Sequence, residues 1–249
     1  VKPDLLGANA FSLANVSQAP EYDYWLLSTY IHRCKNLKTV VMVADEANLF
    51  DQPMEDEPEE WYRCRYYRIY MDYPKHSKCS KYNLECSHVS TFSRKLPPAL
   101  RYAFTGAYSI ECDSLGFGNS FNTPERFDST FMEDYAIRVA AYHRCKDWSQ
   151  VERNFAYMMK IARLCRDKGV RLILVTPPMW KGFVEKVSKR QLAVMRACIA
   201  KLQKATGALY GDYLQDARFQ GVDFYDADHL SKQGAAKFTT ILKSDFPGF

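Results

Sequence analysis

Apolar and polar positions follow two different periods along this chain, and each period predicts a different kind of element. Residues 39–44 (TVVMVA) and 170–178 (VRLILVTPP) are short apolar runs, rich in β-branched residues, which is typical of strands buried on both faces of a sheet. Residues 208–213 (ALYGDY) predict another short strand. Residues 7–17 (GANAFSLANVS) predict a strand that runs into a loop, so four strands are expected.

Between these runs, apolar residues recur every three to four positions, as on one face of a helix. The clearest case is residues 149–169, where Ser149 and Glu152 have the spacing of a capping box and Gly169 has the place of a C-terminal stop. The same pattern predicts three further helices: one at residues 19–38, one capped by Ser188, and a terminal helix that starts at Ser231.

Strands that alternate with helices predict an α/β fold with a mostly parallel sheet covered by helices on both faces. In such sheets, ligands bind at the carboxyl ends of the strands. Residues 43–46 (VADE), 175–178 (VTPP) and 224–229 (FYDADH) are all expected to emerge at that edge. Polar side chains in these three segments are therefore candidates for a functional site.

The rhythm is lost in the middle of the chain, and we predict one domain, 1–249, with an insertion of helices and loops at about 49–125. Inserted segments often shape a binding cleft. Residues 61–73 (WYRCRYYRIYMDY) interleave arginines with tyrosines, as some nucleic-acid binders do. A helix is favoured instead, because the acidic run 54–60 (MEDEPEE) just before it would repel phosphate. That helix is expected to bury Tyr62, Tyr66, Ile69 and Tyr70.

Composition adds limits rather than a function. The 249 residues are 47% hydrophobic and 25% charged. A net charge of +5 spread over 34 basic and 29 acidic residues is too mixed to argue for nucleic acid from charge alone, and no nucleic-acid partner is expected. The eight cysteines include no CxxC pair, so a zinc site has little support. Cys79 and Cys86 lie in a polar stretch and could pair. No apolar run is long enough to span a membrane.

Asp226 and His229 lie in a turn just before the terminal helix. Their spacing lets the carboxylate bind the imidazole Nδ1–H, fix the tautomer and leave Nε2 to act as a base. The alternative is that Asp226 and Asp228 are turn or capping residues and His229 packs against the helix start. A third interpretation, a divalent metal bound by Asp223, Asp226, Asp228 and His229, has less support, because no second cluster has ligand spacing.

Residues 225–239 (YDADHLSKQGAAKFT), at the end of an α/β chain, resemble the last signature block of the SGNH/GDSL hydrolase superfamily. In that block, Asp-x-x-His is followed by a polar residue, a glycine and a final helix. The resemblance implies a flavodoxin-like three-layer α/β/α fold, with His229 as the catalytic base and Asp226 as the residue that orients it. The chain looks closest to divergent SGNH-like proteins of bacterial envelopes and polysaccharide gene clusters, which favours the cell envelope or periplasm.

The superfamily's nucleophilic serine lies in a Gly-x-Ser block at the end of the first strand, and this chain contains no such block. We therefore expect that serine upstream of Val1, where any membrane anchor would also lie. Ser12 and Ser17 are alternatives inside the chain, but loop hydroxyls that make local hydrogen bonds are the favoured interpretation.

The oxyanion groups implied by the resemblance are a backbone N–H and an asparagine side chain. Ala14 has the place of the first, and Asp45 and Glu46 stand where the asparagine is expected. Asn15 or Asn48 could take that role. An acid is a poor stabiliser of an oxyanion unless it is protonated, so this departure indicates a divergent site or a site without catalysis.

These features together predict an SGNH-like esterase or O-acyltransferase that acts on a carbohydrate or another cell-envelope molecule. No metal or organic cofactor is implied. The alternative is a non-catalytic SGNH-like protein that binds a glycan or assists assembly. His143 is expected to be a surface or capping residue.

Overall fold

The computed structural model describes most of the chain, namely residues 1–7, 9–53, 63–73, 92–106, 112–118 and 128–249. The chain forms two compact units. The first comprises Val1–Ala14, Pro20–Asp51 and Cys112–Phe249, and the second comprises Asn15–Ala19 and Gln52–Glu111.

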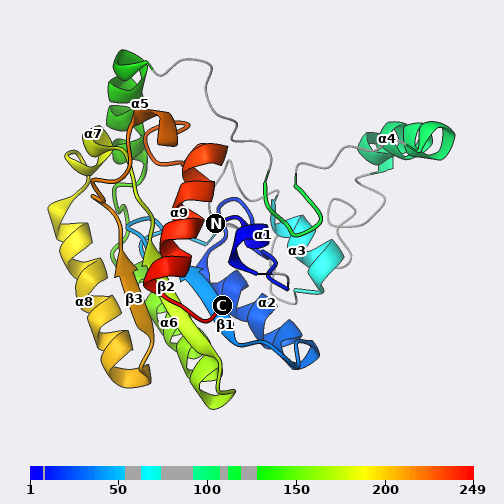
Figure 1. Cartoon of the computed structure of the whole chain (residues 1–249), viewed down its shortest axis with the longest axis horizontal. Coiled ribbons are helices and arrows are strands. Elements are labelled where there is room, and N and C mark those ends of the chain that lie inside the picture. The colour runs from blue at the N-terminus through cyan, green and yellow to red at the C-terminus, as the bar shows by residue number, and fades with distance from the viewer. Residues whose placement is uncertain (8, 54–62, 74–91, 107–111, 119–127) are drawn as a thin grey trace. The chain divides into compact units, whose positions relative to one another are not determined.

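Within the first unit, the described sheet has three parallel strands in the order β1–β2–β3 (Figure 1). They are β1 (Thr39–Val43), β2 (Arg171–Thr176) and β3 (Leu209–Asp212). Val43 pairs with Val175, and Thr176 pairs with Asp212, so the carboxyl ends of the strands lie at one edge. The strands predicted at 39–44, 170–178 and 208–213 and their parallel arrangement are confirmed.

Four helices of the first unit confirm the periodic segments of the sequence. They are α2 (Pro20–Tyr30), continued by the 3-10 helix η1 (Ile31–Arg33), α6 (Ser149–Asp167), α8 (Lys189–Thr206) and α9 (Lys232–Asp245). The described residues of this unit also form α1 (Pro3–Leu6), α5 (Ser129–Tyr142), α7 (Lys181–Val184) and the 3-10 helix η6 (Gly221–Asp223).

Strand β2 is buried on both faces. Leu172 and Leu174 pack in a core that includes residues of α6 and α8, whereas Ile173 and Val175 pack with Phe238 and Leu242 of α9. This is why the strand consists of a continuous apolar run rather than an alternating one. The chain is thus a mixed α/β protein with helices on both faces of a parallel sheet.

Side-chain caps set the starts of two helices as expected. Ser188 Oγ accepts the Gln191 N–H at the start of α8, and Ser231 Oγ accepts the Gly234 N–H at the start of α9. The capping box predicted for Ser149 is wrong. Asp147, which comes earlier in the chain, accepts the Ser149 N–H (2.9 Å) and also binds its hydroxyl, so Ser149 is itself capped.

The strand predicted within residues 7–17 is also wrong, because the described residues of this segment form no strand. Phe11 and Leu13 are 50% and 42% exposed, so the alternating apolar side chains of this segment do not face a core. Ser12, in this segment, donates its backbone N–H to the Leu115 carbonyl (2.8 Å).

The second unit contains α3 (Cys64–Met71) and α4 (Phe92–Thr105). The helix predicted within 61–73 is confirmed, but it buries Cys64 and Tyr67, and Tyr70 is 46% exposed. Tyr67 also donates to Gln18 Oε1 (2.9 Å). The acidic run 54–60, Tyr62, Cys79 and Cys86 lie outside the described residues. Among the described helices, none combines the length and hydropathy that a bilayer crossing requires.

Candidate functional site

The loop 225–229 lies at the carboxyl edge of the sheet and is anchored there. Phe224 and Leu230, on either side of it, form an antiparallel bridge. Trp180, which follows β2 in the chain, donates its N–H to the carbonyl of Ala227 (3.0 Å), and Ala227 is fully buried. The segments after β2 and before α9 therefore meet at this edge, as the topology predicts.

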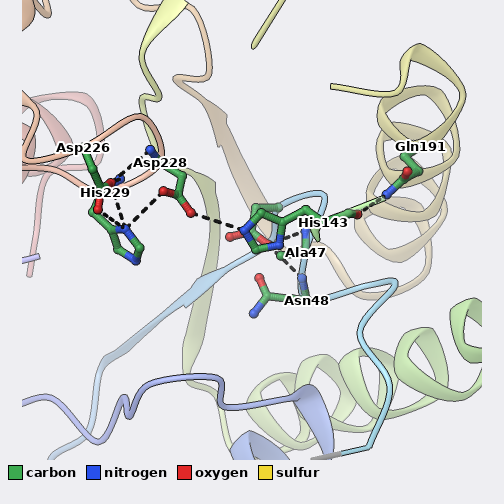
Figure 2. A network of polar contacts seen from close by, with 8 residues as sticks. Ala47, Asn48, His143, Gln191, Asp226, Asp228 and His229 are labelled. Carbon is green, nitrogen blue, oxygen red and sulfur yellow. Dashed lines mark hydrogen bonds and ion pairs between the residues drawn. The ribbon is translucent and has the colours of Figure 1, made fainter. Parts of the chain in front are cut away.

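Asp226 and His229 form the contact that their spacing predicts. The His229 Nδ1 lies 2.9 Å and 3.1 Å from the two carboxylate oxygens of Asp226. Asp226 Oδ1 also accepts the backbone N–H groups of Asp228 (3.2 Å) and His229 (2.8 Å), so the residue shapes the turn as well. The His229 side chain is 45% exposed, and its second ring nitrogen lies on the side away from both carboxylates (Figure 2).

Asp228 links this pair to a second histidine. Its Oδ1 lies 3.2 Å from Nδ1 of His229, and its Oδ2 lies 3.2 Å from Nε2 of His143 (Figure 2). His143 is the C-terminal cap residue of α5, the helix before it, and does not cap α6, whose N-cap residue is Trp148. Its side chain is not a simple surface group, however, because it is only 19% exposed and bonds to Asp228.

The structure brings Asp45 and Glu46 to the same cluster from the end of β1. Asp45 Oδ1 accepts the N–H groups of Ala47 (3.0 Å) and Asn48 (2.8 Å). Glu46 is 1% exposed, and its Oε2 has no hydrogen-bond partner among the described residues. The charges of Asp228 and His143 act on both acids, which places all four groups in one electrostatic environment.

Opposing effects set the proton affinities of the bridged residues. Burial alone would lower the pKa of His229, but its hydrogen bonds to Asp226 and Asp228 and their charges raise that pKa to about 10. Burial alone would raise the pKa of Asp228, yet the hydrogen bonds from His143 and His229 hold it well below its usual range. The pKa of His143 is raised because its contact with Asp228 outweighs its burial.

The neighbouring acids and a tyrosine favour their protonated forms. Burial, followed by the charge of Asp45, raises the pKa of Glu46 to about 8. Burial likewise raises the pKa of Asp45. Burial and the charges of Asp226 and Asp228 raise the pKa of Tyr135, on α5, to about 12. At neutral pH, Glu46 can therefore remain a neutral acid that donates a hydrogen bond.

The other residues proposed from the sequence make local contacts. The Ala14 N–H donates to Ser12 Oγ (3.2 Å). Asn15 and Ser17 belong to the second unit, where the Asn15 amide donates to Gln18 Oε1 (3.0 Å). Ser17 has a left-handed backbone, with φ of 56°. The hydrogen bond that Ser12 Oγ accepts from Ala14 is the local contact expected of a loop hydroxyl.

Two acidic residues lie close enough to His229 to be potential metal ligands. Ligand atoms of Asp226, Asp228 and His229 lie within 4.8 Å of one another. Asp223, the fourth candidate, binds Lys237 Nζ (2.7 Å) and belongs to a separate contact. The hydrogen bonds of Asp226 and the ion pair of Asp228 with His229 account for the short distances without a cation, so we assign no metal site.

The contact between Asp228 and His143 could not be found from the sequence. These residues lie 85 positions apart, and His143 stands outside every motif. Only the packing of the end of α5 beside the 225–229 loop brings them together. The one sequence signal is indirect, since a histidine at a helix C-terminus is favoured by the helix dipole wherever it lies.

Comparisons of the chain with protein-family models, with curated proteins and with solved structures found no match. The function of the site is therefore inferred from its own geometry and from the resemblance of its last block.

Proposed function

We propose that this chain is an SGNH-like protein of flavodoxin-like three-layer architecture that hydrolyses or transfers an acyl ester. The substrate class is a carbohydrate or another cell-envelope molecule. The observation that carries the proposal is the Asp226–His229 contact at the carboxyl edge of the sheet, with Nδ1 directed at the carboxylate and the ring 45% exposed. This is the geometry that a general base requires.

In the proposed mechanism, a serine from a segment before Val1 attacks the ester carbonyl. Nε2 of His229 takes the serine proton and passes it to the leaving alcohol, and Asp226 stabilises the imidazolium. Water or an acceptor alcohol then attacks the acyl-serine, again with His229 as the base.

The first test is His229→Ala in a protein that includes the segment before Val1. We expect kcat/KM for an acyl ester, such as an acetylated sugar, to fall by about 10³-fold or more. His32→Ala, at an exposed histidine of η1, is the matched control and should leave kcat/KM unchanged. Undiminished turnover in His229→Ala would refute the role of His229.

The pH profile of the same protein gives a second check. Because only the neutral imidazole can accept a proton, and the pKa of His229 is raised to about 10, kcat/KM should rise as the pH approaches that value. In Asp226→Asn, the loss of the charge that supports the imidazolium should move this rise to lower pH. A profile that is flat from pH 6 to pH 10 would contradict a base at His229.

One observation favours a second candidate, a non-catalytic protein that binds a glycan at the same site or assists assembly. By the resemblance, Asp45 and Glu46 stand where the superfamily has an oxyanion asparagine, and in the structure Asp45 Oδ1 accepts the N–H groups of its own turn. Glycan binding without ester turnover by the longer protein would support this candidate over the enzyme.

A further inference from the structure

Two carboxylates face one nitrogen in this site, which is more than a general base needs. Asp226 already holds Nδ1 of His229 at 2.9 Å, and Asp228 lies 3.2 Å from the same atom. Two negative charges beside one imidazolium stabilise its proton strongly. A base with two carboxylate partners would have a high pKa and release its proton only at high pH, unless another group competed for one of the carboxylates.

His143 is placed to do this. Its Nε2 lies 3.2 Å from the other oxygen of Asp228, whose side chain is 9% exposed. The rest of His143 is fixed independently of Asp228, because its carbonyl accepts a hydrogen bond from Gln191 of α8 (3.0 Å) and its ring packs edge-on against Phe183 of α7 (6.3 Å between centroids). The Gln191 side chain also accepts the Cys145 N–H, so one residue of α8 binds the backbone of both His143 and Cys145.

We propose that His143 is a positioning residue of the site, which shares Asp228 with His229 and thereby limits how firmly the carboxylates hold the proton on His229. The proposal rests on the proposed function in so far as His229 is the base. Each histidine, when protonated, attracts the carboxylate of Asp228. A positive charge on one histidine therefore lowers the proton affinity of the other. His143 thus competes with His229 for the carboxylate of Asp228.

The other charged groups around the two rings come from several elements. Tyr135 of α5 faces Asp226, Asp45 and Glu46 follow β1, and the charge of Asp51 also acts on His143. All of them are retained when His143 or His229 is replaced. Differences between titration curves of the variants therefore report on the sharing of Asp228.

The experiment is an NMR titration of the histidine side chains in the chain as it stands, which requires neither a nucleophile nor activity. In His229→Gln, the neutral amide removes one of the two competing charges, and we expect the His143 titration to move up by about one pH unit, a tenfold change in proton affinity. In His143→Gln, the His229 titration should rise by the same amount, because coupling between two sites is reciprocal. In Asp228→Asn, both titrations should move to lower pH.

His32→Gln, in η1, is the control and should shift neither curve. Unchanged curves in both glutamine variants, or a shift of only one histidine in Asp228→Asn, would overturn the proposal. If His143→Gln fails to fold, His229→Gln, at a half-exposed side chain, still decides the question. Ester turnover that is insensitive to His229, with the coupling present, would refute the proposed function and leave the sharing of Asp228 intact.

Discussion

Glu46 shows how the environment of one residue can link the site to stability. The residue is 1% exposed with an unbonded Oε2, and burial together with the charge of Asp45 raises its pKa from 4.5 to about 8. The folded state therefore binds this proton more tightly than the unfolded state does. The stabilisation that protonated Glu46 gives to the folded state is fully present below pH 4.5. It is lost as the pH rises to about 8, because the free energy of unfolding falls by about 1.4 kcal/mol per pH unit over this range.

We therefore predict that Glu46→Gln flattens the pH dependence of stability. The amide stays neutral, so the free energy of unfolding of the variant should exceed that of the parent at pH 9 and differ much less at pH 5. Urea denaturation at pH 5, 7 and 9 measures this. The control is Glu152→Gln at an exposed position of α6, which should leave the slope unchanged. Parallel curves for Glu46→Gln and the parent would show that Glu46 ionises normally.

At the scale of elements, the start of α9 holds the loop that carries Asp226 and His229. Ser231 is fully buried, caps the helix and donates to the carbonyl of Val222 (3.0 Å). Gly234, in the first turn, lies so close to the backbone of Asp223 that a Cβ atom would collide with its carbonyl. The helix and the loop are therefore packed backbone against backbone, which only a glycine allows.

This packing predicts that Gly234→Ala destabilises the protein although it improves helix propensity. Alanine in a helix gains up to about 1 kcal/mol over glycine. The collision with backbone atoms should cost more, and we expect a net loss of about 1–2 kcal/mol in the free energy of unfolding. Gly7→Ala, where a Cβ meets nothing within 4 Å, is the control. A stabilised Gly234→Ala variant in chemical denaturation would contradict this close approach.

At the scale of the whole molecule, the described parallel sheet organises the core of the first unit. Its central strand, β2, is buried on both faces, and the ends of β1 and β2 are joined by the Thr176 hydroxyl, which donates to the Ala44 carbonyl (2.6 Å). Helices α6 and α8 supply one core and α9 supplies the other. Substitutions in β2 should therefore affect the stability of the unit more than those in β3, which is partly exposed.

Leu174→Ala tests this arrangement. Leu174 is fully buried in β2, so its truncation should leave a cavity and cost about 2–5 kcal/mol. Leu209→Ala in β3, where the leucine is 38% exposed, should cost less than about 1 kcal/mol. Thermal and urea unfolding monitored by circular dichroism compare the two variants. Equal losses would show that the core does not centre on β2.

The sequence by itself determined the elements whose cause is local. Apolar runs predicted β1, β2 and β3, helical spacing predicted α2, α6, α8 and α9, and the hydroxyls of Ser188 and Ser231 predicted two helix starts. It also predicted the Asp226–His229 contact, because a three-residue spacing in a turn is a local constraint. Two local patterns gave wrong predictions. At Ser149 the neighbouring Asp147 accepts the N–H instead, and at 7–17 the apolar side chains of Phe11 and Leu13 are exposed and face no core.

Only the tertiary structure decided which residues surround that pair. Asp228 meets His143 from 85 positions away, and Asp45 and Glu46 reach the same cluster from the end of β1. Burial and the charges of these neighbours set the proton affinities of the cluster, and neither quantity is encoded in a short motif. The sequence thus specified a histidine and its carboxylate, and the packing of α5, β1 and the 225–229 loop specified the electrostatic environment in which they act.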